Sequence, residues 1–305
     1  MIRPKPLRKG DIVAVAAPAG PFDRREFLAG IKYLRDLGFK VTFRKDIFKK
    51  ELYLAGDDNR RADELNQFFA DPSIKAIFFA RGGYGTQRIL HLLDAEAIKA
   101  NPKIILGYSD ITALHAWLYR HDIGGSFYGP TVCKHFKFAP KRALDLLMGA
   151  ITSAAPLGMI PFSGAKVLKG GQAEGILVGG CLSLITSSIG TPYELPTEDT
   201  ILFLEDVGEA VYRYDRMLNQ LKTAGKLRGV KGIIFGSLGL IKGENAGWMN
   251  KMLADILANF PGPIITNFPS GHLPLKKFFV TLPLGVTARL STKPLGLEIT
   301  EPALE

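Results

Sequence analysis

The feature that most constrains the fold is the alternation of short apolar runs with helical segments in the first half of the chain. Residues 11–17 are an apolar run that ends in a proline- and glycine-containing loop, which predicts a buried strand and a turn. Phe27, Ile31 and Leu34 then recur at helical spacing until Gly38. Strands separated by helices predict a doubly wound, mostly parallel sheet. The predicted strands are 11–17, 41–43, 76–80 and 104–106, and the predicted helices are 27–37, 57–69, one from about 86, and 112–120.

The composition of the sequence changes near residue 150. Residues 154–175 are rich in glycine and proline, which predicts a crossing between domains. Beyond it, further strands (201–204, 233–235, 264–265) alternate with helices (212–221, 249–257), and 278–299 is strand-rich. We therefore predict an N-terminal α/β domain over 1–152, a linker over 153–172, and a smaller, strand-rich C-terminal α/β domain over 173–305.

Composition excludes several classes of protein. With 305 residues, 47% hydrophobic and 22% charged, the chain is globular. The net charge of +10 comes from scattered lysines and arginines without zinc-finger or basic-heptad spacing, so nucleic-acid binding is not favoured. Two cysteines cannot form a disulfide framework. No secretory leader and no 18-residue apolar stretch is present, so we expect a cytoplasmic protein that does not span a membrane.

A glycine-rich loop, Arg-Gly-Gly-Tyr-Gly at residues 81–85, follows a predicted strand. Its glycines let the backbone approach a ligand and present N–H groups to an anion. The loop lacks the lysine and the spacing of a phosphate-binding P-loop. A tight turn between strand and helix explains the same residues, and both interpretations stay open.

Ser109 follows the apolar strand at 104–106 and precedes a helix. Strand, sharp turn, serine and helix form the pattern of a nucleophile elbow, although Ile111 stands where its second glycine would be. The alternative is that Ser109 or Asp110 only caps the helix.

A serine nucleophile needs a base and a group that orients the base. Of five histidines, His272 lies in a loop between Gly271 and Pro274 and is the best candidate base; a turn histidine exposed to solvent is the alternative. The others, His91, His115, His121 and His135, fall in or near predicted helices and strand ends.

Glu205 ends an apolar strand, where a carboxylate is well placed to bind an imidazole N–H. Asp206 and Glu209 are rivals, and the three together could instead cap a helix. Cys181, at the start of a helix, fits a small buried hydrophobe better than a nucleophile. The sequence has no metal-ligand spacing, so we expect neither a metal nor a cofactor.

Together these blocks resemble a known family. Arg-Gly-Gly-Tyr-Gly at 81–85, Gly-Tyr-Ser-Asp at 107–110, Gly-Gly at 179–180, Glu-Asp-Val-Gly-Glu at 205–209 with Tyr212 and Asp215-Arg216, and Gly271-His272 occur in the order found in the LD-carboxypeptidases, serine peptidase family S66. The resemblance covers nearly the whole chain.

The resemblance implies a triad of Ser109, Glu205 and His272 in a cleft between two domains. It also implies an oxyanion hole from the N–H of Asp110 and of one glycine of the pair Gly82 and Gly83. The implied activity is release of the terminal D-alanine from murein tetrapeptide during cell-wall recycling, by a protein that is often a homodimer.

Arg81 and Tyr84 are candidate substrate contacts, and a solvated or structural arginine is the alternative for Arg81. Cys181 departs from the family, in which asparagine usually follows the two glycines. Two alternatives remain: a peptidase of the same family that cleaves peptidyl- or aminoacyl-adenylates such as microcin C, and a non-catalytic module that binds murein fragments or nucleic acid.

Overall fold

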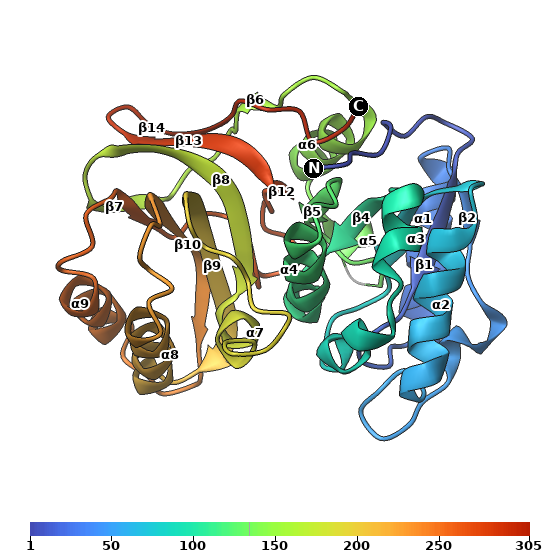
Figure 1. The fold of residues 1–305 in the computed structure, drawn as a ribbon, viewed down its shortest axis with the longest axis horizontal. Coiled ribbons are helices and arrows are strands. Elements are labelled where there is room, and N and C mark those ends of the chain that lie inside the picture. Colours follow the sequence, from blue (N-terminus) through green and yellow to red (C-terminus); the bar gives the residue numbers. More distant parts are fainter. Residues whose placement is uncertain (134) are drawn as a thin grey trace.

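The alternating segments of the first half form a six-stranded sheet in a computed structural model that describes residues 1–133 and 135–305 (Figure 1). Its strand order is β12-β5-β4-β3-β1-β2, and all neighbours are parallel except β12, which pairs antiparallel with β5. This confirms the predicted doubly wound sheet. The strands are β1 (Ile12–Ala16), β2 (Lys40–Thr42), β3 (Ile74–Phe79), β4 (Ile104–Gly107), β5 (Ser126–Tyr128) and β12 (Leu282–Leu284).

Helices cover both faces of this sheet, because successive strand residues point to opposite sides. Val13 and Val15 pack in one core with Phe27, whereas Ala14 packs in the other with Leu65. The first face carries α1 (Arg24–Asp36), α5 (His135–Phe138) and α6 (Lys141–Thr152). The second carries α2 (Asp58–Ala70), α3 (Ala95–Ala100) and α4 (Thr112–Arg120). Short 3₁₀ helices are η1 (Lys45–Phe48), η2 (Thr86–Leu92) and η3 (Ser109–Ile111), so the helix expected near Thr86 is a 3₁₀ helix.

The second half builds an eight-stranded sheet beside the first (Figure 1). Its strands are β6 (Gly158–Met159), β7 (Lys166–Lys169), β8 (Gln172–Cys181), β9 (Thr200–Glu209), β10 (Gly232–Leu240), β11 (Ile264–Thr266), β13 (Val286–Thr292) and β14 (Leu295–Ile299), in the order β6-β14-β13-β8-β9-β10-β11-β7. The central strands β8 to β11 are parallel, and antiparallel strands flank them on both sides.

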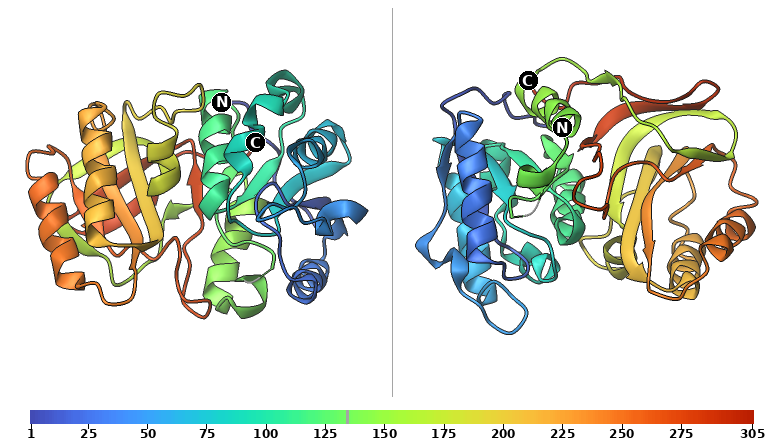
Figure 2. Two further views of the ribbon diagram at one scale, coloured as in Figure 1. Left: turned by 90° about the horizontal axis from the view of Figure 1, so that it is seen from below. Right: turned by 180° about the vertical axis from the view of Figure 1, so that it is seen from behind.

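One face of the second sheet is covered by α7 (Leu182–Ser187), α8 (Val211–Thr223) and α9 (Ala246–Ile256), which lie on the side away from β13 and β14 (Figure 2). On the other face, Phe203 and Ile234 pack with Phe268 and with Leu290 of the antiparallel strands. The antiparallel strands at one side of the sheet therefore cover part of this face.

The chain passes between the two halves more than once. The segment 153–172, which we expected to be a linker, contains β6 and β7 of the second sheet, and β12 returns to the edge of the first. Leu304 is buried in the first core, and the N–H of Glu305 donates to the carbonyl of Pro4 at 3.0 Å, so the two termini lie together (Figures 1 and 2). Within the described residues, no helix is both long and apolar enough to cross a membrane.

Candidate active site

Ser109 lies at the turn between β4 and α4. Its φ is +65°, a left-handed conformation that is unfavourable for a residue with a Cβ. The 3₁₀ helix η3 begins at Ser109 and continues directly into α4. This is the strained strand–turn–helix geometry of a nucleophile elbow.

The glycine loop after β3 runs against this serine. A Cβ added to Gly82 would lie 2.7 Å from the Cβ of Ser109 and 2.9 Å from its Oγ, so only glycine fits there. The carbonyl of Gly82 accepts a hydrogen bond from the N–H of Gly20 at 3.3 Å. The Asp110 carboxylate accepts the N–H of Thr86 at 2.8 Å, which ties the end of the loop to the elbow.

Glu205 and His272 come from the second sheet. Glu205 lies on β9 and is fully buried. His272 lies in the loop after β11, and its own N–H donates to Glu205 Oε2 at 2.9 Å. Gly271 has a φ of +102°, and a Cβ there would collide with the Glu205 carboxylate, so this position also requires glycine.

A continuous chain of hydrogen bonds connects the three side chains. His272 Nε2 lies 3.1 Å from Ser109 Oγ. On the other side of the ring, Nδ1 lies 2.9 Å from Glu205 Oε2 and 3.1 Å from Oε1. The structure thus brings together the three residues singled out in the sequence, at distances suited to proton transfer.

Burial opposes protonation of His272, but the hydrogen bond and the charge of Glu205 outweigh it, so the pKa of His272 is raised above its ordinary value. Asp206 adds a smaller effect in the same direction. The imidazolium form is therefore stabilised. A base that accepts a proton during the reaction needs this stabilisation.

Tyr128, at the end of β5, was missed by sequence reasoning. Its hydroxyl donates to Glu205 Oε1 and accepts the N–H of Ser109, at 3.2 Å. The only signal in the sequence is a tyrosine in the three-residue strand at 126–128, which is too short for its periodicity to be recognised. Its role depends on the approach of β5 to β9.

The rival acids have other partners. Asp206 accepts the N–H of Ser183 at the start of α7, at 2.7 Å, and Glu209 pairs with Arg213 at 3.1 Å. The remaining histidines also lie elsewhere in the fold. His115 is buried against the carbonyl of Gly107 at 2.9 Å, and burial lowers its pKa to about 4.

His91 is exposed on η2, and His121 Nδ1 contacts the carbonyl of Trp117 at 2.8 Å. His135 Nε2 lies 3.3 Å from the hydroxyl of Tyr108, the residue that precedes Ser109.

Cys181 lies directly beside Glu205 in the pairing of β8 with β9. Its N–H donates to Thr112 Oγ1 at 2.9 Å across the two halves. Burial raises the pKa of its thiol well above the ordinary value, and the charge of Glu205 adds to this, so the thiol stays protonated and is a poor nucleophile.

The candidate substrate contacts lie at the surface. Arg81 donates to the carbonyl of Pro21 at 2.8 Å, and its charge acts on the hydroxyl of Tyr108. The Tyr84 side chain is exposed and packs against Tyr53, with ring centroids 5.9 Å apart.

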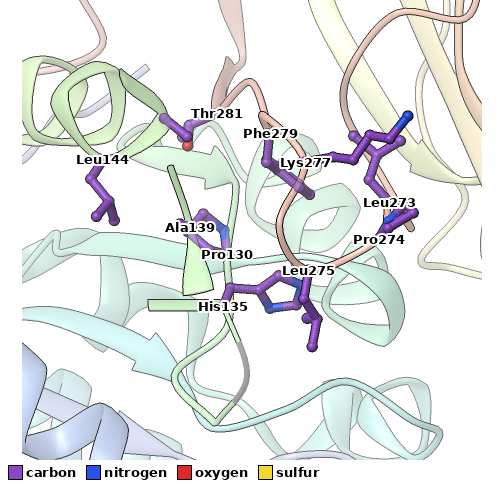
Figure 3. A pocket seen from close by; sticks show the side chains of 11 residues that line it. Pro130, His135, Ala139, Leu144, Leu273, Pro274, Leu275, Lys277, Phe279 and Thr281 are labelled. Carbon is purple, nitrogen blue, oxygen red and sulfur yellow. The ribbon is translucent and has the colours of Figure 1, made fainter. Parts of the chain in front are cut away.

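The loop after His272 continues as one wall of a mainly apolar pocket, which faces Pro130, His135 and Leu144 from the first half of the chain (Figure 3). Leu273 and Leu275 belong to this wall. In the described residues, no three His, Cys, Asp or Glu side chains gather as a metal site would require.

Fold and geometry together define a two-domain α/β protein with the side-chain arrangement of a serine hydrolase at the contact between its sheets. Residues 13–129 match the LD-carboxypeptidase N-terminal domain, and residues 174–290 match the LD-carboxypeptidase C-terminal domain. The chain therefore belongs to the LD-carboxypeptidase family, peptidase family S66, as the resemblance implied.

Similar proteins fall into two groups. A probable murein peptide carboxypeptidase of Bacillus subtilis is 36% identical, over 95% of this chain and 92% of its own length. The microcin C7 self-immunity protein MccF of Escherichia coli is 30% identical, over 97% of this chain and 95% of its own.

Solved structures fall into the same groups. MccF in its wild-type apo state superposes with a TM-score of 0.91 at 25% identity, covering 100% of both chains. The muramoyltetrapeptide carboxypeptidase of Oxalobacter formigenes gives 0.82 at 27% identity, covering 95% of this chain and 99% of that one. The family thus contains murein peptide carboxypeptidases and immunity proteins of the MccF type.

Proposed function

We propose that this protein is a serine LD-carboxypeptidase that releases the terminal D-alanine from murein tetrapeptide. The observation that carries the proposal is the chain of hydrogen bonds from Ser109 through His272 to Glu205. Similarity to the two murein peptide carboxypeptidases named above supports the substrate class. The setting we propose is cell-wall recycling in the cytoplasm, by a homodimer.

In the proposed reaction, His272 Nε2 takes the proton of Ser109 Oγ, which attacks the carbonyl carbon of the scissile L-to-D peptide bond. His272 then returns this proton to the amine of the leaving D-alanine. Water, activated by the same imidazole, hydrolyses the acyl-serine. Glu205 holds the imidazole with Nδ1–H toward the carboxylate and stabilises its protonated form.

The oxyanion that forms at the carbonyl needs N–H donors. Our candidates are the N–H of Asp110 and one glycine of the pair Gly82 and Gly83. The Gly82 carbonyl is held by Gly20, so the N–H of Gly83, on the same trans peptide, points away from Gly20. This orientation favours Gly83. Loss of one such donor costs about 3–4 kcal/mol of transition-state stabilisation.

Arg81 is our candidate for the substrate's terminal carboxylate. Its guanidinium has one N–H donor in use on Pro21 and further donors that could form a forked pair with a carboxylate. Tyr84, exposed on the same loop, is a candidate contact for the rest of the peptide.

The first experiment is mass spectrometry of murein tetrapeptide after incubation with the wild type and with Ser109→Ala, without added metal and with a chelator. We expect loss of one alanine with the wild type only. Turnover by a folded Ser109→Ala variant would contradict the serine mechanism, and a loss of activity with chelator that zinc restores would point to a metallopeptidase.

Hydrolysis of a peptidyl- or aminoacyl-adenylate is the second candidate, favoured by the similarity to MccF. The alignment with MccF extends over 333 positions, more than the 305 residues of this chain, so MccF carries segments that have no counterpart here. The same assay with an aminoacyl-adenylate analogue tests this candidate. Cleavage of the analogue without cleavage of tetrapeptide would replace our proposal, and binding without hydrolysis of either would favour a non-catalytic module.

A further inference from the structure

Tyr128 has a buried hydroxyl that the proposed reaction does not use. Its side chain is fully buried at the end of β5, with its ring packed against Tyr108, His115 and Phe203 at centroid distances of 6.1, 5.9 and 5.3 Å. The ring alone would satisfy this packing, and a phenylalanine would supply it. The hydroxyl therefore needs a separate explanation, because a buried polar group is costly unless it is hydrogen-bonded.

Within the part of the chain that the structure describes, both polar contacts of this hydroxyl are to members of the candidate triad. The Ser109 N–H can only donate, so the hydroxyl oxygen accepts it, at 3.2 Å. Because the hydroxyl has a single proton, that proton is directed to Glu205 Oε1. Burial, together with the charge of Glu205, raises the pKa of Tyr128 well above its ordinary value, so the proton stays on the tyrosine.

One of these contacts, from the Tyr128 hydroxyl to Glu205, crosses the boundary between the two sheets. Ser109 and Tyr128 belong to the first sheet and its loops, whereas Glu205 and His272 belong to the second. Among the described residues, two side-chain hydrogen bonds join the halves of the triad: His272 to Ser109, and Tyr128 to Glu205. The first must break and re-form as protons move, but the second need not.

We propose that Tyr128 is a positioning residue, whose hydroxyl aligns Glu205 with the Ser109 backbone across the domain boundary and moderates the charge that Glu205 presents to His272. The proposal rests on the proposed function for its kinetic consequences. It also implies that the Ser109 N–H is engaged and does not take part in the oxyanion hole, which leaves that role to Asp110 and a glycine.

The electrostatic consequence has a definite sign. The charged groups that face His272 are the carboxylates of Glu205 and Asp206, and the Tyr108 ring packs against it at 4.9 Å. A hydrogen bond from Tyr128 draws negative charge from Glu205. Without it, the carboxylate stabilises the imidazolium more strongly, and the pKa of His272 rises further.

The test is Tyr128→Phe, with Tyr214→Phe as the matched control. Tyr214 is equally buried, but its hydroxyl donates to the carbonyl of Gly239 at 2.9 Å and not to a member of the triad. We expect Tyr128→Phe to lower kcat about tenfold or more, because the variant loses a hydrogen bond to a charged group. KM should change by less than about twofold. The acid limb of its kcat/KM profile should move to higher pH, and Tyr214→Phe should leave this limb in place.

NMR titration of the His272 imidazole in the protein without substrate measures the same shift independently of activity. An unchanged His272 pKa in folded Tyr128→Phe would overturn the proposal, even if stability and kcat fall. If the wild type cleaves neither tetrapeptide nor adenylate, the proposed function fails, and the titration still decides the role of Tyr128.

If Tyr128→Phe does not fold, fluorotyrosine at position 128 replaces it, because fluorination keeps the ring and the hydroxyl and makes the hydroxyl a stronger donor. The pKa of His272 should then shift downward. No shift, or an upward one, would overturn the proposal.

Discussion

At the scale of single residues, the backbone of Ser109 shows how the elbow is built. A left-handed conformation costs a residue with a Cβ about 1–2 kcal/mol, and here it turns the hydroxyl toward His272. The surrounding fold must hold this conformation in place. The stability of variants at this position should therefore report the strain separately from the chemistry.

We expect Ser109→Gly to be more stable than Ser109→Ala by up to about 1 kcal/mol, because glycine adopts the left-handed region without strain, although it also gains entropy when unfolded. Both variants should be inactive. Urea unfolding followed by circular dichroism measures the difference. An alanine variant more stable than the glycine variant would show that the elbow is not strained.

Glu205→Gln should lower kcat by about a thousandfold or more, because the amide favours the wrong imidazole tautomer and removes the charge that stabilises the imidazolium. Asp206→Asn should have a much smaller effect, since Asp206 accepts the backbone N–H groups of Ser183, at the start of α7, and of Val207. Steady-state kinetics of the two variants, with melting temperatures as controls, make the comparison. The reverse order of effects would assign the acid to Asp206.

The pH dependence follows from the raised pKa of His272. The imidazole must be neutral to act as a base, so kcat/KM should fall as the pH drops through a pKa above about 6.5, the usual value for histidine. For stability the sign is opposite: the raised pKa contributes stability that is fully present below the unfolded value and is lost as the pH rises through the folded one. An acid limb below the usual histidine value would contradict this assignment.

At the scale of elements, α1 and α6 pack on the same face of the first sheet, and each contains a glycine with a different environment. A Cβ at Gly30 of α1 would collide with the carbonyl of Val132, whereas at Gly149 of α6 it would meet nothing within 4 Å. Gly30 therefore allows α1 to lie close to the backbone at Val132. Gly149 makes no such contact and only lowers the helix propensity of α6.

We expect Gly149→Ala to raise the free energy of unfolding by about 0.5–1 kcal/mol, the propensity difference in a helix interior. Gly30→Ala should lower it by more than this, because α1 must move away from Val132. Thermal unfolding of the two variants beside the wild type tests the pair. Stabilisation by Gly30→Ala would mean that α1 is free to move outward.

At the scale of the whole molecule, the second half of the chain contributes β12 to the first sheet, and both sheets contribute residues to the candidate site. Leu282 and Leu284 of β12 pair with β5, which carries Tyr128, and Leu304 fills the first core. Cutting the chain at the predicted boundary would remove all three from the first half. The halves should therefore stabilise each other.

A fragment of residues 1–152 should unfold with much lower cooperativity and at a lower temperature than the full chain, because the edge of β5 and part of its core lose their cover. Differential scanning calorimetry and amide exchange of β5 measure this. A fragment as stable and as well protected as the full chain would show that the first domain is independent of the returning strand.

Local patterns in the sequence determined most of the first sheet and the residue types of the candidate triad. Apolar runs and helical periodicity depend on neighbours in the chain, so strands such as β1, β3 and β4 were predictable. The residue types around Ser109, Glu205 and His272 marked a serine, an acid and a base. Their order in the chain matched a family.

Tertiary structure alone decided what depends on residues far apart in the chain. The glycine- and proline-rich segment 153–172 contributes β6 and β7, because edge strands are defined by their partners more than by their own pattern. Tyr128 belongs to the site only because the fold places the end of β5 beside Glu205 of β9. The choice of Glu205 over Asp206 depended on which carboxylate β9 turns toward His272. A sequence records which groups are present, but their distances are fixed only when separate sheets pack together.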